Sequence, residues 1–480
     1  MKKFFKIFLV AWMSFSITSC DNYLDEMSPD LPTSDQIWVS YESAEKYLIS
    51  AYAYTYTAGW MFHEYFYLPE NFRADDLKAE NGTTAWSYLA RIVNFTNRAD
   101  ESVSRTLWTE WYKGIKLCND IIENVPEMDM ITEDQQNELV AEARFLRAFY
   151  HFNLQRNFHD IIVRDAVPKT PEELQKATST IEEVYMFVEE DLKFATEHLP
   201  SSWPASKFGR ATNAAANAYL GKTFLYQEKW SEAAEALGNV RGHSLVSGDR
   251  YRSLFDGTDE MSEEIIFSRQ YTDDQMDLIN QWHQLGVAFA PADLNGGWDM
   301  CSVSDYAMDQ FDAGDMRKEA TVLESGQEFD GEEITFNDPD RKMLIKYVEG
   351  LSNISSNRSF ADVILMRYAN VVLMRAEALN EMGQDGEAQS LINDIRGRAG
   401  LNPISFTGDQ LRQEIRKQRL VELIGESERF YDLVRWDIVK EQLGMAQNPY
   451  ADNFEEKHSF FPIPLEEVQR NRFVDPTPGF

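Results

Sequence analysis

The 480-residue sequence contains little cysteine, and it lacks the short motifs that mark the common enzyme classes. Its three cysteines, Cys20, Cys118 and Cys301, form neither a disulfide framework nor the paired spacing of a structural zinc site. The sequence leaves open whether Cys118 and Cys301 pair across the fold. No GxSxG, HExxH, P-loop or GxGxxG motif is present. We therefore expect a protein that is not an enzyme, with no catalytic residues, no metal ligands and no cofactor.

Positive charge is also scarce. The chain has 46 Lys and Arg residues against 80 Asp and Glu, which gives a formal net charge of −34. Such a surface repels phosphate backbones, so we expect no nucleic-acid partner. With this many carboxylates, chance pairs that resemble a glycosidase site carry little information. His151 and His159 lack a third convergent ligand and are interpreted as packing residues. The acidic loop 256–260 would permit a structural calcium ion.

Long apolar runs are absent, and the longest near the N-terminus, residues 7–17, is too short to span a membrane. It follows Lys2, Lys3 and Lys6 and precedes Ile17-Thr18-Ser19-Cys20. A basic head, an apolar middle and small residues before a cysteine are typical of a bacterial lipoprotein signal. We predict that residues 1–19 are a signal peptide and that an acylated Cys20 attaches the protein to a membrane. The alternative is ordinary cleavage with an unmodified Cys20.

Helical periodicity, in contrast, is abundant. Residues 367–438 hold three long amphipathic segments with short connections, and further helical patterns precede them. Two helical pairs place small residues twelve apart: Gly221 with Ala233, and Ala376 with Ala388. This spacing is typical of tetratricopeptide repeats, in which small residues let two helices cross closely. The predicted fold is mostly α, a tetratricopeptide-like scaffold of helical hairpins. The alternative is two unrelated hairpins.

The periodicity fades between residues 242 and 360, where short apolar runs alternate with pieces rich in Gly, Asp and Ser. We divide the mature chain into an N-terminal helical region (20–241), an irregular loop-rich insertion (242–360) and a C-terminal helical region (361–480). Loops carried by a rigid scaffold are common places for binding sites. The insertion is therefore a candidate for ligand binding.

Aromatic residues make up 13% of the chain, and two loop-like stretches place rings beside Asn, Asp and Arg. Flat rings cover the apolar faces of a sugar, while amides, carboxylates and guanidiniums bond to its hydroxyls. Each ring has the alternative of packing inside the scaffold. The candidate ligand-binding residues are Trp60, Tyr65, Arg73, Asp75, Asn81, Trp86, Trp282, Asn295, Trp298 and Asp299. Trp108, Trp111, Arg435 and Trp436 are interpreted as core and ion-pair structure. Glu422, Glu428 and Arg429 are expected to tie the last helices together, because a charge run of this kind is usually a solvated or bridging face.

Several segments, in order along nearly the whole chain, carry a family resemblance. They are the lipobox at Cys20, Trp108-Thr-Glu-Trp111-Tyr112 with Asn119, EARFLRA (142–148), GRAT (209–212), RYANVVLMRAEALNE (367–381), IRGRAGL (395–401), ERFYDLVRW (428–436) and FFPIP (460–464). On these segments the chain resembles the SusD/RagB family of outer-membrane nutrient-binding lipoproteins of Bacteroidota. One departure is the closing VDPTPGF, where the family often has QNPGY.

The resemblance implies a lipid-anchored, surface-exposed protein of the outer membrane. Such a protein binds an oligosaccharide without catalysis and passes it to a partner, a SusC-like TonB-dependent outer-membrane transporter. The resemblance also implies that the two aromatic stretches join into one ligand surface. Two alternatives stay open: a peptide-binding member of the same family, and a protein-interaction scaffold without a small ligand.

Overall fold

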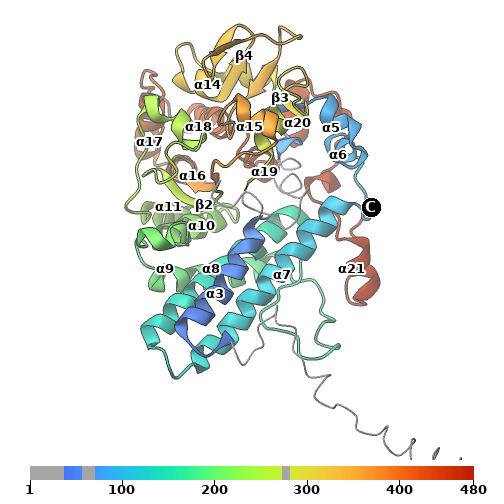
Figure 1. The fold of residues 1–480 in the computed structure, drawn as a ribbon, viewed down its shortest axis with the longest axis vertical. Coiled ribbons are helices and arrows are strands. Elements are labelled where there is room, and N and C mark those ends of the chain that lie inside the picture. Colours follow the sequence, from blue (N-terminus) through green and yellow to red (C-terminus); the bar gives the residue numbers. More distant parts are fainter. Residues whose placement is uncertain (1–36, 57–70, 273–281) are drawn as a thin grey trace, which may run out of the picture.

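The structure is a computed structural model that describes residues 37–56, 71–272 and 282–480, and the structural statements below concern these residues. Long helices stack side by side over most of the molecule, and short strands lie above and between them (Figure 1). The fold is mostly α on a tetratricopeptide-like scaffold, as the sequence predicts.

The first helical layer comes from the N-terminal region. Its helices are α3 (Tyr41–Tyr52), α7 (Ser102–Asn124), α8 (Glu133–Phe158) and α9 (Ile181–His198). Helix α8 packs between α7 and α9, and α3 lies against α7 and α8. Three of these helices begin with capping boxes in which a Ser or Thr hydroxyl accepts a backbone N–H, at Ser40, Thr132 and Thr180.

The two predicted repeat pairs form two helical hairpins. They are α10 (Asn213–Leu225) with α11 (Trp230–Gly238), and α16 (Tyr368–Glu381) with α17 (Asp385–Arg398). Although the insertion separates them in sequence, α11 packs directly on α16, and α18 (Gly408–Leu423) then covers α16 and α17. A Cβ on Gly221 would lie 2.8 Å from Cδ2 of Leu237, so glycine permits the close crossing that the spacing predicts.

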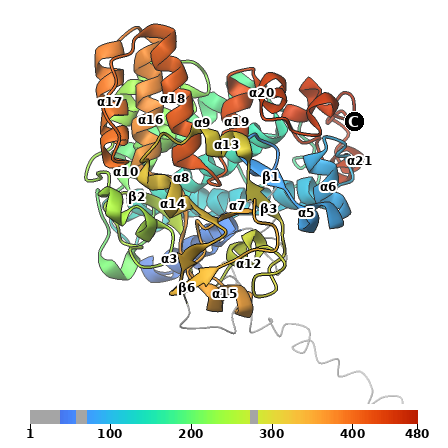
Figure 2. The same ribbon diagram turned by 90° about the horizontal axis from the view of Figure 1, so that it is seen from above.

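Between the hairpins, the described residues of the insertion, 242–272 and 282–360, form short elements (Figure 2). These are β2 (Ile265–Arg269), α12 (Leu285–Phe289), β3 (Cys301–Val303), α13 (Asp305–Gln310), α14 (Met316–Thr321), β4 (Val322–Glu324), β5 (Gln327–Phe329), β6 (Glu332–Ile334), β7 (Lys342–Leu344) and α15 (Leu351–Ser356). The strands form antiparallel two-stranded sheets. Strand β4 pairs with β7 and β5 with β6, while β3 pairs with β1 (Leu77–Ala79) and β2 with β8 (Val363–Arg367). Hydrogen bonds thus join the insertion to both flanking regions.

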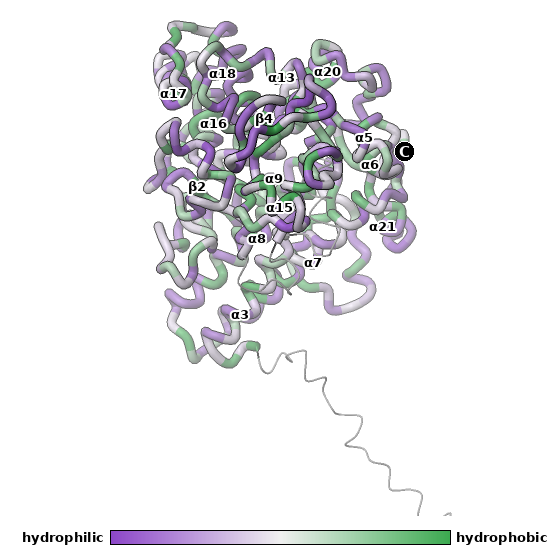
Figure 3. The backbone as a smooth tube through the Cα atoms, turned by 45° about the horizontal axis from the view of Figure 1, so that its top comes forward, coloured by the Kyte–Doolittle hydropathy of each residue, from purple (hydrophilic) through white to green (hydrophobic). Residues whose placement is uncertain are grey.

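The insertion has its own hydrophobic core, which includes Phe255, Phe289 and Leu344 and continues into Leu420 and Val421 of α18. A larger core fills the helical scaffold. Figure 3 shows polar and apolar stretches alternating along the chain. Among the described helices, none is both long and apolar enough to span a membrane.

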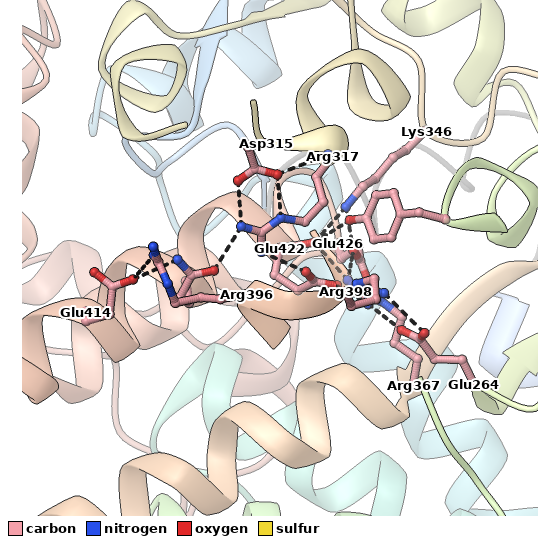
Figure 4. Close-up of polar contacts among 12 residues, drawn as sticks. Glu264, Asp315, Arg317, Lys346, Arg367, Arg396, Arg398, Glu414, Glu422 and Glu426 are labelled. Carbon is pink, nitrogen blue, oxygen red and sulfur yellow. Dashed lines mark hydrogen bonds and ion pairs between the residues drawn. The ribbon is translucent and has the colours of Figure 1, made fainter. Parts of the chain in front are cut away.

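A buried set of charged side chains, here called the ionic seam, joins the insertion to the C-terminal helices (Figure 4). It consists of four carboxylates and four basic groups: Glu264, Asp315, Glu422, Glu426, Arg317, Lys346, Arg367 and Arg398. Glu422 lies 2.9 Å from Nη1 of Arg317 and 2.6 Å from Nη1 of Arg367. Burial alone raises the pKa of Glu422, but Arg398, Arg367 and Arg317 outweigh it and hold that pKa well below its usual value.

The sequence interpretation of the last helices needs one correction. Glu422, Glu428 and Arg429 were expected to tie those helices to one another on a solvated or bridging face. Instead they are buried and reach distant segments: Glu428 binds Lys222 of α10, and Arg429 binds Asp75 at 2.7 Å. A charge pattern on a helix does not reveal which segment will cover it.

The remaining helices are short, and they complete the C-terminal region and the part that precedes α7. They are α5 (Asn81–Ala85), α6 (Ser87–Val93), α19 (Arg429–Arg435), α20 (Val439–Met445) and α21 (Leu465–Arg470). The structural interpretation of the scaffold aromatics is confirmed. Trp108 and Trp111 are buried, and Glu377 binds both Arg435 and the indole N–H of Trp436.

The structure also shows whether Cys118 pairs with Cys301 and whether His151 packs in the core. Cys118 and Cys301 are buried free thiols and do not pair. His151 is buried, its Nδ1 lies 2.9 Å from the carbonyl oxygen of Arg147, and burial lowers its pKa to about 3. It is a core residue, as the sequence analysis proposed.

Candidate functional site

The two aromatic stretches meet because β1 and β3 pair. Leu77 lies opposite Val303 and Ala79 opposite Cys301. Beyond the strands the two chains stay in contact, since the Glu80 N–H donates to the carbonyl of Met300 at 3.0 Å and the Gly82 N–H to that of Asp299 at 2.8 Å. Residues far apart in sequence are thereby fixed side by side by backbone hydrogen bonds.

The segment that carries Trp298 is held from the other side by the end of α12. The N–H groups of Trp298 and Met300 donate to the carbonyls of Val287 and Ala288, at 2.8 and 3.0 Å. Asp299 has a φ of +56°, which turns the chain sharply after Trp298. Backbone hydrogen bonds therefore hold the Trp298 segment on both sides.

Trp86 stands at the corner between α5 and α6, as the last cap of one and the first cap of the other. Its ring centroid lies 6.2 Å from that of Trp298, with an angle of 36° between the planes, and 5.8 Å from that of Tyr88. Trp86 and Trp298 are half-buried: each packs on the core of the insertion and keeps part of its surface exposed. We call this pair the tryptophan platform.

Polar groups border the platform. The Asn81 amide donates to Oδ2 of Asp299 at 3.4 Å, and Nη1 of Arg341 lies 2.8 Å from Oδ1 of the same carboxylate. Arg341 also lies 3.4 Å from Glu80 and donates to the carbonyl of Cys301 at 2.7 Å. The buried guanidinium fixes the carboxylate of Asp299, while Asn81 is exposed.

Two other predicted residues lie along α15. The exposed Asn295 donates to the carbonyl of Leu351, the first residue of that helix, at 3.2 Å. Trp282 lies beyond the opposite end, with the guanidinium of Arg358 5.5 Å from its ring centroid. Because α15 has six residues, about 9 Å of helix separates these contacts. The structure places Trp282 with Arg358 rather than within the tryptophan platform.

Arg73 and Asp75, predicted as ligand-binding residues, lie in the interior and need correction. They are 2% and 1% exposed. The Arg73 guanidinium lies over the rings of Phe430 and Phe461, at 4.0 and 4.4 Å, and Asp75 accepts two 2.7 Å hydrogen bonds from Arg429. Their role is to join the 71–76 segment to the C-terminal helices. Polar residues beside rings can equally form buried ion pairs, and the sequence pattern does not distinguish the two cases.

Three predicted residues lie outside the described residues. Trp60 and Tyr65 fall within 57–70, and the predicted lipidation residue Cys20 falls within 1–36. Their roles stay predictions.

Glu80, Tyr88 and Arg341 were not among the predicted site residues. Glu80 and Tyr88 lie within the first aromatic stretch, residues 60–88, but were not selected from it. Arg341 lies in a turn, DPDRKM, without any aromatic neighbour, and its place beside Asp299 depends on the β3–β7 contact. No signal in the sequence indicates it.

The arrangement suits binding better than catalysis. Half-exposed rings can cover an apolar face, and adjacent amide and carboxylate groups can bond to hydroxyls. Within the described ranges, no group of three or more His, Cys, Asp or Glu is placed to hold a metal ion. In the acidic loop, Asp256 and Asp259 pair with Arg252 and Arg250.

Comparisons with known proteins identify the family. The model of the SusD family matches residues 263–480, and the model described as "Starch-binding associating with outer membrane" matches residues 22–225. SusD-like protein P2 of Formosa agariphila is 29% identical over 430 residues, 81% of this chain and 83% of that protein. SusD-like protein P25 of the same organism is 26% identical over 523 residues, 97% of this chain and 96% of that protein.

Solved structures show the same fold. A SusD superfamily protein from Bacteroides vulgatus has a TM-score of 0.82 and 26% identity, covering 92% of this chain and all of that one. A laminarin-binding SusD-like protein has a TM-score of 0.78 and 26% identity, covering 92% of this chain and 99% of that one. The two family models together span both helical regions, and the chain belongs to the SusD family of Bacteroidota.

Proposed function

We propose that this protein captures a glycan at the surface of the outer membrane and delivers it to a TonB-dependent transporter. The observation that carries the proposal is the tryptophan platform, two half-buried rings from distant segments with Asn81 and Asp299 at their border. Stacking on the rings would hold a sugar face, and the polar border would select among its hydroxyls. Binding of this kind involves no turnover.

The family supports the ligand class. One matching family model carries a starch-binding description, and one structure at 26% identity is a laminarin-binding protein. Both polysaccharides are neutral. A neutral ligand also suits a chain with a formal net charge of −34, which would repel an anionic polymer.

The proposal also includes a lipid anchor at Cys20 and a partner TonB-dependent transporter. A family model begins at residue 22, just after the predicted acylated cysteine, and its description includes association with the outer membrane. Labelling cells with a fatty acid should mark the wild type and not Cys20→Ala, and the wild type should co-purify with a TonB-dependent transporter. An unlabelled wild type released from the membrane would contradict the anchor.

The site is tested by affinity electrophoresis of the mature protein in gels that contain laminarin or starch. The wild type should be retarded by at least one of them, and Trp86→Ala or Trp298→Ala should weaken the affinity about tenfold or more, as removal of a central aromatic contact does. Trp230→Ala is the matched control, because Trp230 is half-buried at the start of α11 in the scaffold.

Trp282→Ala measures whether that ring belongs to the site; its contact with Arg358 predicts an affinity close to that of the wild type. Equal retention of the wild type, Trp86→Ala and Trp298→Ala would contradict the platform. Release of reducing ends from either polysaccharide would contradict the expectation of no turnover. Affinity for peptides with none for glycans would favour the peptide-binding alternative.

A further inference from the structure

A concave surface lies at the other end of α6 from the tryptophan platform. It is a groove of about 760 Å³ between three loops: residues 95–100 after α6, residues 452–458 before α21, and the C-terminal residues 479–480. Hydrogen bonds join its walls, since Asn453 donates its side-chain amide to the carbonyl of Asn94 at 3.0 Å and the Leu465 N–H donates to the carbonyl of Ala99 at 2.9 Å. The groove is preformed by these contacts.

A series of rings supports one wall of the groove. Phe95 packs edge-to-face on Phe454 at 5.2 Å, His458 lies 5.9 Å from Phe95, and Phe480 lies 5.9 Å from His458. The first three are buried, whereas Phe480 is half-buried and lines the groove. Phe480 thus packs on His458 and keeps part of its surface exposed, as the rings of the tryptophan platform do, and the Lys457 ammonium lies 5.8 Å from its ring centroid.

The rest of the groove is lined by polar groups that include both hydrogen-bond donors and acceptors. Asn97 is half-buried in its wall, and Thr96 and Asp452 are exposed there. Hydroxyl, amide and carboxylate groups thus stand beside one aromatic ring. A sugar hydroxyl both donates and accepts hydrogen bonds, so a mixed set of groups suits it better than a set of one kind.

Charge in the groove is close to balanced. Arg98 lies 2.7 Å from Asp100, and Lys457 lies 3.2 Å from Glu455, which leaves Asp452 as the remaining side-chain carboxylate of the lining. Paired charges give little attraction for a polyanion or a polycation, and the net charge of the whole chain disfavours an anionic ligand. A neutral, hydroxyl-rich ligand fits this balance.

The groove and the platform lie at opposite ends of the same helix. Trp86 caps the start of α6, and Phe95 follows its last cap, Asn94. Nine residues at 1.5 Å each give about 13 Å between them. A polysaccharide is long enough to contact both places, and linked contacts raise the overall affinity above that of either one.

We propose that this groove is a second binding site for neutral glycan, with Phe480 as its stacking ring and Asn97 as a hydrogen-bonding group. The proposal rests on the glycan-binding function given above and extends it to a separate surface. Together the two sites would favour long polymers over short oligosaccharides.

The test compares four mature proteins in laminarin and starch gels: the wild type, Trp86→Ala with Trp298→Ala, Phe480→Ala, and all three changes together. The double tryptophan variant should keep a weak retardation that the triple variant loses. Phe480→Ala alone should weaken polymer binding about tenfold or more through lost avidity. Asn97→Ala should act in the same direction without touching the packed C-terminal ring.

Phe473→Ala is the matched control, because Phe473 is 51% exposed in the same C-terminal segment and does not line the groove. The second site is overturned if the double and triple variants behave identically, or if Phe480→Ala and Phe473→Ala both match the wild type. Retention that depends on Phe480 but not on Trp86 or Trp298 would instead overturn the platform and keep the groove. A wild type that neither polysaccharide retards would overturn both.

Discussion

The insertion has two edges of opposite chemistry. Along one edge, the ionic seam buries four carboxylates and four basic groups against the C-terminal helices (Figure 4). Along the other, strand β3 pairs with β1, and the tryptophan platform keeps part of its ring surface exposed. Charge lies inside the molecule and aromatic surface lies outside, the reverse of the usual expectation.

The difference follows from which groups make the connection. At the seam, side chains join the two parts, so every charge must find a partner or remain unpaired in a dry interior. At the platform, backbone hydrogen bonds at Glu80, Gly82 and Trp298 join the two segments, and the two tryptophan rings keep part of their surface exposed. Where backbone hydrogen bonds join two segments, nearby rings can stay exposed for ligand binding. Where charged side chains join them, those side chains are buried and stabilise the contact between the insertion and the C-terminal helices.

The largest expected effect comes from unbalancing the seam with Glu422→Ala. This change would leave the guanidiniums of Arg317 and Arg367 buried with one partner fewer, which typically destabilises a protein by about 3–5 kcal/mol. The midpoint of urea unfolding measures the loss. Glu422→Gln keeps the shape and should lose less.

The control is Glu42→Ala, which removes a carboxylate whose ion pair with Lys46 is 76% exposed on both sides. Its unfolding midpoint should not differ measurably from that of the wild type. If Glu422→Ala unfolds at the same urea concentration as Glu42→Ala, the ionic seam does not stabilise the contact between the insertion and the C-terminal helices.

The next effect depends on pH and concerns Asp76, which links the two edges. Its carbonyl accepts the Ser304 N–H beside β3, and its carboxylate accepts the Gly425 N–H beside the seam. Burial, followed by the charge of Asp75, raises the pKa of Asp76 to about 7. In the unfolded chain an aspartate ionises near pH 3.9, so between these values the folded protein binds more protons. Its stability therefore falls as the pH rises through this window.

Asp76→Asn cannot ionise and should remove that fall. The variant should match the wild type near pH 4 and exceed it by on the order of 2–4 kcal/mol at pH 8, because one pKa unit corresponds to about 1.4 kcal/mol. Urea unfolding of both proteins at several pH values gives the comparison. A stability difference that stays constant from pH 4 to pH 8 would show that Asp76 is not the titrating group.

The scaffold was predictable because its signals are local. Gly221 and Leu237 belong to one hairpin, and helical spacing alone puts them together. The meeting of Trp86 and Trp298 was also predicted, although the family resemblance, and not the spacing of residues, joined their two stretches. Their binding role stays a prediction.

The ionic seam was not predictable from sequence. Its members come from the insertion and from four places in the C-terminal region, so no window of sequence contains them. Arg73 and Asp75 failed as site residues for the same reason, since their partners Phe430 and Arg429 lie more than 350 positions away. The sequence of a loop shows which of its residues are polar. Whether those residues are exposed depends on which distant segment packs over the loop.

The smallest effect probes the backbone connection at the platform itself. A Cβ on Gly82 would overlap the carbonyl oxygen of Trp298 and lie 2.7 Å from that of Asp299. Gly82→Ala should therefore push the Trp298 segment away from Trp86 and weaken glycan binding severalfold, at a stability loss of about 1–3 kcal/mol.

Gly397→Ala is the matched control in α17, where a Cβ meets open space and should stabilise the protein by about 0.5–1 kcal/mol. Affinity electrophoresis and urea unfolding of both variants separate the two effects. If Gly82→Ala binds glycan as the wild type does, the close backbone approach does not set the platform, and the rings hold their positions by packing alone.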